Sequence, residues 1–227
     1  MSIDFIPSDH IDLGVWDVPG SALTLSAWVN QDTSPADPRI IMKGVGINSS
    51  DHWWGLVVNG GNDRPEFRVF TDAYSTLAAS TVLLPNTWYH VCGTYDGANM
   101  RVYIDGTQEG ITGKTGAIKA EAAASVWIGD QPGAPTERSF DGRLEDVRVY
   151  DRALTAGEVS TLFVTRGTDN IVRGLVSRWL LNEGAPGVTV PAAADTIKDT
   201  TGTHHGTESG SPVFAEGSIR FRRKTNG

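Results

Sequence analysis

Residues 88–106 read WYHVCGTYDGANMRVYIDG, and this stretch decides the fold class of the chain. Successive side chains on each side of the turn sequence DGAN (96–99) would point to opposite faces, for example Val91 to one face and Cys92 to the other. This is the pattern of two antiparallel strands joined by a tight turn. A second turn signal, DG at 105–106, leads into a further strand. The stretch therefore predicts antiparallel β-structure.

Short strands of the same kind follow one another through the first 150 residues. We expect them at 22–30, 39–43, 53–59, 66–71, 77–84, 125–129 and 140–150. The 26 glycines and 11 prolines are spread along the chain, which suits many short strands better than a disordered linker. Strands at this spacing predict an all-β fold, a sandwich or jelly roll of two antiparallel sheets.

One short helix is expected after these strands. Thr155 and Glu158 have the spacing of a capping box, in which each residue bonds the backbone of the other. The helix should therefore begin at this point, cover about 155–164 and end before Gly167.

Composition limits the partners and the compartment. The 227 residues carry a formal net charge of −8, which argues against nucleic acid as a partner. Cys92 is the single cysteine, so an internal disulfide is excluded, and its place within a strand indicates a buried, unreactive thiol. No apolar run is long enough for membrane insertion. The opening MSIDFIPSDH lacks the basic and apolar regions of a signal peptide, so we expect synthesis in a cytoplasm.

The end of the chain differs from the rest in charge. Four basic residues crowd there, namely Arg220, Arg222, Arg223 and Lys224. They have two interpretations, a solvated tail or a docking segment for an acidic surface on a partner.

Several segments together carry a family resemblance. They are ALTLSAWVN (22–30), RIIMKG (39–44), TWYHVCGTYDGANMRVYIDG (87–106), SVWIGD (125–130) and FDGRLEDVRVYDRALTAGEVSTLF (140–163). In this order and spacing they make residues 3–165 resemble the laminin G-like, concanavalin A-like lectin and glucanase jelly-roll family. The resemblance implies two antiparallel sheets of six or seven strands each, with a short helix after the DVRVY strand.

The C-terminal segment 173–222 resembles the N-terminal part of the same family. It opens with GLVSRWLLNEG (174–184), and SIRF (218–221) repeats the SIDF of residues 2–5. The chain therefore looks circularly permuted, or cut from a tandem array within a repeat. We treat 1–227 as a single domain, with 1–165 as the main sandwich. Segment 173–222 then either completes this sandwich, which we favour because the termini of compact domains are usually close, or pairs with a neighbouring subunit.

Residues for catalysis are not apparent. Glycanases on this fold need two carboxylates close together, and relatives place them in a Glu-x-Asp-x-x-Glu pattern that does not occur here. Glu145 and Asp146 are adjacent, so they would point to opposite faces of a strand. His204 and His205 lie in a Gly/Thr-rich region, so we expect them in a loop rather than as metal ligands. We therefore expect no enzyme.

The resemblance implies one structural Ca²⁺, held by hard oxygen ligands. Mapped by motif, its ligands would be the carboxylate of Asp146 and backbone carbonyls near Asp9 and Gly44. The alternative is that Asp146 only hydrogen-bonds a turn.

A glycan site would need exposed aromatic rings beside amide and carboxylate groups. Residues of these types on neighbouring strands and loops are His52, Trp53, Asn59, Asn62, Asp63, Asp72 and Tyr74. Trp53 and Trp54 are consecutive, so one of them must face outward if both lie in a strand. The outward ring either contacts a sugar or is covered by a loop or by the C-terminal segment.

These features favour a non-enzymatic laminin G-like binding or structural module. A lectin-like fold without a visible export signal suggests a bacteriophage virion accessory protein, either capsid-decorating or fibre-associated. Such a protein would be homo-oligomeric, would contact a capsid protein or cell-surface glycans, and would act on a virion surface or outside cells. The alternatives are a free carbohydrate-binding module, which a glycan array would reveal, and a divergent glycanase, which paired carboxylates in a groove would reveal.

Overall fold

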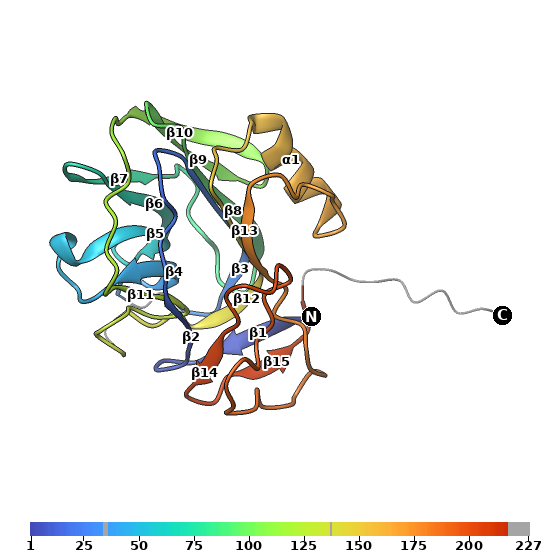
Figure 1. Cartoon of the computed structure of the whole chain (residues 1–227). Coiled ribbons are helices and arrows are strands. Elements are labelled where there is room, and N and C mark those ends of the chain that lie inside the picture. Colours follow the sequence, from blue (N-terminus) through green and yellow to red (C-terminus); the bar gives the residue numbers. More distant parts are fainter. Residues whose placement is uncertain (34–35, 137, 218–227) are drawn as a thin grey trace.

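A computed structural model describes residues 1–33, 36–136 and 138–217 as two antiparallel sheets packed face to face (Figure 1). Sheet A has the spatial order β10 (Thr107–Gly113), β9 (Asn99–Ile104), β8 (Trp88–Tyr95), β3 (Leu23–Gln31), β12 (Gly142–Tyr150), β1 (Ser2–Phe5) and β15 (Val213–Ala215), and β13 (Leu175–Trp179) also pairs with β12. Sheet B has the order β14 (Thr207–Ser209), β2 (His10–Val15), β11 (Ser125–Ile128), β4 (Arg39–Gly44), β5 (His52–Asn59), β6 (Arg64–Phe70) and β7 (Tyr74–Ala78). The predicted sandwich is confirmed, but sheet A has eight strands rather than six or seven, because β13 also pairs with β12.

The hairpin expected within residues 88–106 is confirmed, both in the pairing of its strands and in the faces to which its side chains point. β8 and β9 pair antiparallel, with Val91 opposite Ile104. Val91 belongs to the core between the sheets, whereas Cys92 belongs to a second cluster on the outer face of sheet A. Gly93 allows the close approach of the sheets, because a Cβ at this position would lie 2.3 Å from Cγ of Phe67 on sheet B.

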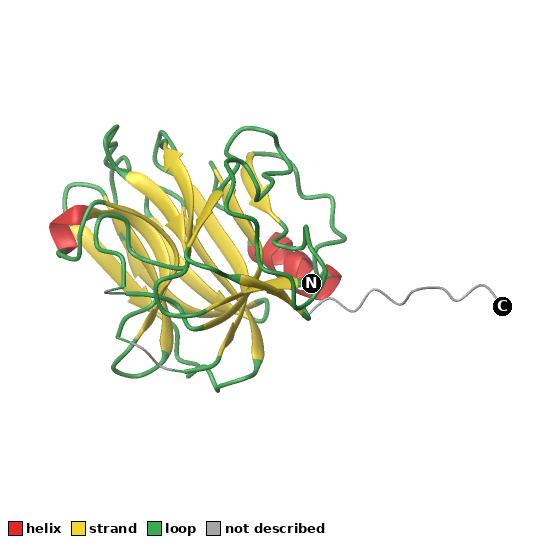
Figure 2. Ribbon diagram, turned by 90° about the horizontal axis from the view of Figure 1, so that it is seen from below, coloured by secondary structure: helices red, strands yellow, loops and turns green. Residues whose placement is uncertain are grey.

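The expected helix is α1 (Ala156–Thr165), and its capping box is confirmed. The Thr155 hydroxyl accepts a hydrogen bond from the Glu158 amide (3.3 Å), and the Glu158 carboxylate accepts one from the Thr155 amide (2.8 Å). Arg166 ends the helix in the left-handed conformation, one residue before Gly167. α1 packs on the outer face of sheet A, away from sheet B, and Figure 2 shows it on the opposite side of the strands from the short helix η1 (Ser49–Asp51).

The strand expected at 77–84 is wrong in its bounds, because β7 covers Tyr74–Ala78 and residues 79–84 leave the sheet. The backbone amides of Ser80 and Thr81 donate to the carboxylate of Glu109, at 2.9 Å and 2.8 Å. A side chain of β10 thus takes the hydrogen bonds that a neighbouring strand would otherwise accept.

The C-terminal segment lies on the same sandwich. β13 pairs with β12, β14 with β2, and β15 with β1. Trp179 is fully buried, and its indole N–H donates to the carbonyl of His204 (2.7 Å). At the end of the segment, the Ser2 hydroxyl donates to the carbonyl of Glu216 (3.1 Å), so the two ends of the described chain lie side by side. Among the described residues, no helix has the length and apolar character needed to span a membrane.

Candidate functional site

One hollow on the outer face of sheet B, the face turned away from sheet A, combines charged groups, an amide and glycine backbone. We call it the Arg68 pocket; its volume is about 400 Å³, and it is lined by Ala36, Asp37, Asn59, Gly60, Gly61, Arg68 and Arg138. Leu56, Val58, Phe67 and Val69 face the core, so alternation along β5 and β6 turns Asn59 and Arg68 to the outer side. Two loops complete the wall: the segment before β4 brings Asp37, and the β11–β12 loop brings Arg138.

The carboxylate of Asp37 is the centre of the charges at this pocket. It lies 2.7 Å from Nη1 of Arg39, 2.6 Å from Nη2 of Arg68 and 3.8 Å from Nε of Arg138. Burial alone would raise the pKa of Asp37, but Arg39 and Arg68 outweigh it and hold the pKa below its ordinary value. Asp37 is therefore a fixed anion that gathers three guanidinium groups.

Arg39 forms the floor of this cluster and is fully buried. Its Nε donates to Oε1 of Gln131 (2.8 Å), and Nη1 donates to the carbonyl of Asp37 (2.7 Å). Burial, followed by the nearby charge of Arg68, lowers the pKa of Arg39 to about 10. The group is still charged at neutral pH, so the protein holds a buried cation beneath the pocket.

Glu66 and Asn59 orient the polar groups at the rim. Oε2 of Glu66 accepts from Nε (3.2 Å) and Nη2 (2.9 Å) of Arg68, while Oε1 accepts from the Asn59 amide (2.7 Å). The side-chain oxygen Oδ1 of Asn59 in turn accepts a hydrogen bond from the backbone amide of Gly61 (2.9 Å), which fixes the side chain to the turn. The Arg68 guanidinium and the Asn59 amide are thereby positioned before any ligand arrives.

His52 and Tyr74 border the same cluster, with their ring centroids 5.9 Å apart. Burial, then the charges of Arg39 and Arg68, lower the pKa of His52 to about 4, so this ring is neutral at neutral pH. Burial also raises the pKa of Tyr74, so its phenol stays protonated. Both aromatic rings beside Arg39 and Arg68 are thus uncharged at neutral pH.

Two of the predicted glycan-binding residues are buried. His52 is 3% exposed and Trp53 is 5% exposed, so neither ring offers an open face to a sugar. The ammonium of Lys119 lies over Trp53, 5.8 Å from the ring centroid, and the Lys119 amide donates to the carbonyl of Phe70 (2.9 Å). Of the two alternatives for Trp53, the structure agrees with the one in which a loop covers the ring, here the loop between β10 and β11.

The other predicted residues divide between the two ends of β6. Asn62 and Asp63 lie in the β5–β6 turn, next to the Arg68 pocket, and Oδ1 of Asp63 accepts from Gln31 (3.2 Å). Asp72 lies beyond the other end of β6, where it pairs with Lys114 at 3.0 Å. The structure thus does not gather the predicted set, and Asp37, Arg68 and Arg138 were missed. Asn59, which the sequence also suggested, lines the pocket beside the Gly60–Gly61 turn.

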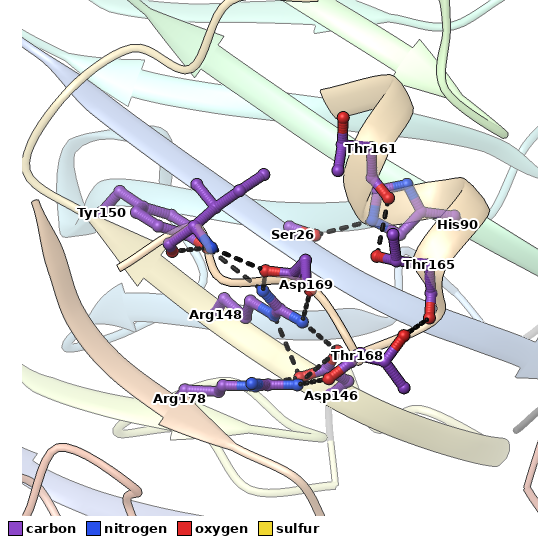
Figure 3. A network of polar contacts seen from close by, with 12 residues as sticks. Ser26, His90, Asp146, Arg148, Tyr150, Thr161, Thr165, Thr168, Asp169 and Arg178 are labelled. Carbon is purple, nitrogen blue, oxygen red and sulfur yellow. Dashed lines mark hydrogen bonds and ion pairs between the residues drawn. The ribbon is translucent and has the colours of Figure 1, made fainter. Parts of the chain in front are cut away.

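Asp146 belongs to a buried network of charges on the outer face of sheet A (Figure 3). Its Oδ1 accepts from Nε of Arg148 (3.0 Å) and Nε of Arg178 (2.7 Å), and its Oδ2 accepts from Nη2 of Arg148 (2.6 Å). Arg148 also pairs with Asp169 at 2.8 Å. Burial would raise the pKa of Asp146, but the two arginines outweigh it and keep the pKa below its ordinary value.

The three predicted calcium ligands are not brought together. Asp146 gives its oxygens to two guanidinium groups on sheet A. Asp9 and Gly44 lie on sheet B, Asp9 just before β2 and Gly44 at the far end of β4. These residues do not fit the ion, and the described residues contain no other group of three or more His, Cys, Asp or Glu that could hold a metal. That the protein binds one structural Ca²⁺ stays a prediction from the sequence.

Glu145 and Asp146 do not point to opposite faces as expected. β12 has a register shift at this point in its pairing with β3, and Asp146 has a φ of 51°. Leu144 and Val147 both face the core, so the two acidic side chains between them lie on the outer side. Glu145 lies 3.6 Å from the N-terminal amine, so both carboxylates are engaged in ion pairs.

A serine, a histidine and an aspartate meet on the C-terminal segment without forming a nucleophile. The Ser177 hydroxyl lies 2.5 Å from Nδ1 of His204, and Oδ2 of Asp199 lies 4.0 Å from the same nitrogen. In a catalytic triad the serine and the carboxylate bind opposite ring nitrogens. Ser177 is also fully buried, so this contact fastens the loop that carries His204 and His205.

Two further sequence predictions concern reactive and docking residues. Cys92 is buried, and burial raises the pKa of its thiol, as expected for an unreactive cysteine. The predicted docking residues Arg220, Arg222, Arg223 and Lys224 lie outside the described residues.

Comparisons with known proteins agree with the fold. The model of the concanavalin A-like lectin/glucanases superfamily matches residues 7–160. Pappalysin-1 of Mus musculus is 26% identical over 164 residues, a match that covers 66% of this chain but 10% of pappalysin-1.

Two solved structures share the fold at low sequence identity. A candidate carbohydrate-binding protein from Bacteroides ovatus has a TM-score of 0.71 and 22% identity over 95% of this chain and 61% of that chain. The CBM40 domain of a Ruminococcus gnavus sialidase, bound to α2,3 sialyllactose, has a TM-score of 0.59 and 13% identity over 71% of this chain and 95% of that chain.

Proposed function

The chain belongs to the concanavalin A-like lectin/glucanases superfamily, and on this premise we propose that it is a non-enzymatic carbohydrate-binding module. The observation that carries the proposal is the Arg68 pocket, which sets a carboxylate, an amide and two guanidinium groups around one hollow. We further propose that it acts outside cells or on a surface. The structural neighbours described as carbohydrate-binding support this proposal by their shared fold.

The pocket has the chemistry that sugar hydroxyls need. Planar carboxylate, amide and guanidinium groups each offer two hydrogen-bonding atoms, and Asp37, Asn59 and Arg68 supply one group of each kind. Arg68 bonds Asp37, and Glu66 bonds both Arg68 and Asn59, so the three groups are held in place and little side-chain entropy is lost on binding. Gly60 and Gly61 leave the turn without side chains, which lets a sugar ring approach the backbone.

The same charges argue against hydrolysis at this place. A glycosidase needs one carboxyl group with a raised pKa to protonate the leaving oxygen. At the pocket, the arginines hold the pKa of Asp37 below its ordinary value, and Glu66 is engaged by Arg68 and Asn59. A binding role therefore fits these carboxylates better than a catalytic one.

A glycan array with three pocket and control variants tests this function. We expect the wild-type chain to bind at least one glycan, and Asn59→Ala and Arg138→Gln to weaken that binding at least tenfold. Arg101→Gln is the matched control, because Arg101 pairs with Asp96 in an exposed contact on sheet A. Binding that is equally strong in the pocket variants would contradict the site, and the absence of any bound glycan would contradict the function. Release of reducing ends from a bound glycan would contradict the non-enzymatic role.

The place of action on a bacteriophage virion stays a prediction from the sequence, together with homo-oligomerisation and docking through the basic residues at 220–224. Light scattering after size-exclusion chromatography tests the oligomeric state. Co-sedimentation with virus particles, compared between the full chain and a chain ending at Gly217, tests the docking segment.

A further inference from the structure

The charges around the Arg68 pocket are not balanced. Of the residues that line it, Arg68 and Arg138 carry guanidinium groups and Asp37 carries a carboxylate. This count covers the described residues. The local excess of positive charge occurs in a chain whose formal net charge is −8. The charge of the pocket is thus opposite in sign to the charge of the whole protein, and side-chain packing does not require this difference. A positive pocket favours an anionic group on a ligand.

The buried arginine keeps this charge close to the pocket. Arg39 is fully buried, and its Nη2 has no hydrogen-bond partner among the described residues. A cation in a medium of low dielectric constant acts over a longer range than one at the surface. The depressed pKa of His52, to which both Arg39 and Arg68 contribute, reports the same positive field.

Arg68 supplies the geometry for an anion. Its side chain is 7% exposed and reaches the pocket wall. Nη1 donates one hydrogen bond, to Oδ2 of Asp37 at 3.2 Å, so its second N–H is available to a ligand. Glu66 and Asp37 occupy both two-atom edges of the guanidinium, so this single N–H is the donor left for a ligand. A charge-assisted bond from it to a carboxylate oxygen is about twice as strong as a bond between neutral groups.

We propose that the Arg68 pocket recognises an acidic saccharide, with a sugar carboxylate at Arg68 in the field of Arg39 and Arg138. The Asn59 amide and the backbone at Gly60 and Gly61 then bond hydroxyls of the same or the adjoining ring. The inference rests on the proposed carbohydrate-binding function and names the class of glycan. Uronic acids and nine-carbon sugar acids carry the same carboxylate, so the test treats them as separate arms.

Calorimetric titration with matched pairs of sugars tests the inference. One arm compares trigalacturonate with its methyl ester, and the other compares sialyllactose with lactose, so each pair differs in the charged carboxylate. We expect the acidic member of at least one pair to bind at least tenfold more tightly. This preference should shrink in 0.5 M salt, which screens the charge. Arg68→Gln should abolish the preference, and Arg138→Gln should reduce it, while Arg101→Gln should leave it unchanged.

The outcomes separate the inference from the function on which it rests. Equal or tighter binding of the neutral members would overturn the acidic preference and leave carbohydrate binding intact. A preference that persists in both Arg68→Gln and Arg138→Gln would overturn the assignment to this pocket. If no sugar in the panel or on the array binds, both proposals fail. Arg138 is 26% exposed, so its variant serves as the test even if Arg68→Gln does not fold.

Discussion

Gly93 on β8 faces the ring of Phe67 across the core, and both positions are fully shielded from solvent. A methyl group at 93 would lie 2.3 Å from Cγ of Phe67, and the buried ring has no free space to enter. We expect Gly93→Ala to lower the free energy of unfolding by about 1–3 kcal/mol through overpacking. Urea unfolding measures the change.

Gly157→Ala is the matched control for this substitution. A Cβ at Gly157 would meet no atom within 4 Å, and alanine is a better helix former, so this variant should lose no stability. If both variants lost the same stability, the effect would not come from the contact between the sheets.

His90 makes the stability of the protein depend on pH. It is buried beneath α1, its Nε2 lies 2.8 Å from the Ser26 hydroxyl, and burial lowers its pKa to about 4. Between pH 6.5, where histidine titrates in the unfolded chain, and pH 4, the unfolded state binds more protons than the folded state. The free energy of unfolding should therefore fall as the pH falls through this window, by about 3 kcal/mol from His90.

Urea unfolding at pH 7, 6, 5 and 4.5 tests the contribution of His90 against His90→Gln. The variant should be less stable than wild type at pH 7, and the gap should narrow as the pH falls. His52 has a similarly depressed pKa and stays in both proteins, so it adds the same slope to each. A gap that stays constant over the whole range would refute the assignment to His90.

At the scale of elements, the network of Figure 3 joins β12, β13 and the loop after α1 through four charged side chains. Asp146→Asn keeps the shape of the side chain and suits the left-handed backbone, but it leaves Arg148 and Arg178 without their shared anion. Breaking a buried ion network in this way costs about 3–5 kcal/mol. We expect a loss of this size in urea unfolding, together with faster proteolysis near residues 168–175.

The control for this variant is Asp96→Asn. Asp96 pairs with Arg101 at 2.6 Å, but both side chains are partly exposed, so the change should cost at most about 1 kcal/mol. Equal effects of the two substitutions would show that the network does not fasten β13.

Elements with local signals could be predicted, and those with distant partners could not. The β8–β9 hairpin and α1 follow from a turn sequence and a capping box that lie within a few residues of each other. Residues 79–84 were expected to extend a strand, yet the amides of Ser80 and Thr81 bond Glu109 on another element. The bulge at Asp146 is likewise held by Arg148 and Arg178, and Arg178 lies on a different strand.

The candidate site shows the same limit. The Gly60–Gly61 turn is visible in the sequence, but Asp37 and Arg138 come from loops on either side of it in the chain. Trp53 was predicted to bind a sugar because side chains alternate along a strand, so one of the consecutive Trp53 and Trp54 must point away from the core. Alternation does not show what then covers that side chain, and here the covering residue is Lys119.

At the scale of the whole molecule, the two ends of the described chain meet in one pair of strands. Ser2 lies opposite Ala215, and β15 runs antiparallel to β1. A Cβ at Gly217 would lie 2.7 Å from the carbonyl carbon of Met1. Residues 217 and 1 are therefore close enough for a tight turn to join them. Joining the ends would therefore turn β15 and β1 into an ordinary hairpin.

This arrangement predicts that a circular permutant will fold. The permutant begins at Gly174, joins Gly217 to Met1 through a short glycine linker and ends at Arg173, which restores the family-like order of segments suggested by the sequence. It cuts no strand and no bond of the Figure 3 network, so we expect an unchanged far-UV spectrum and a melting temperature within a few degrees of the chain ending at Gly217. A second permutant opened between Val147 and Arg148, inside β12, should not fold. A permutant that is insoluble would contradict this prediction, and one that folds only as a dimer would assign β13–β15 to a neighbouring subunit.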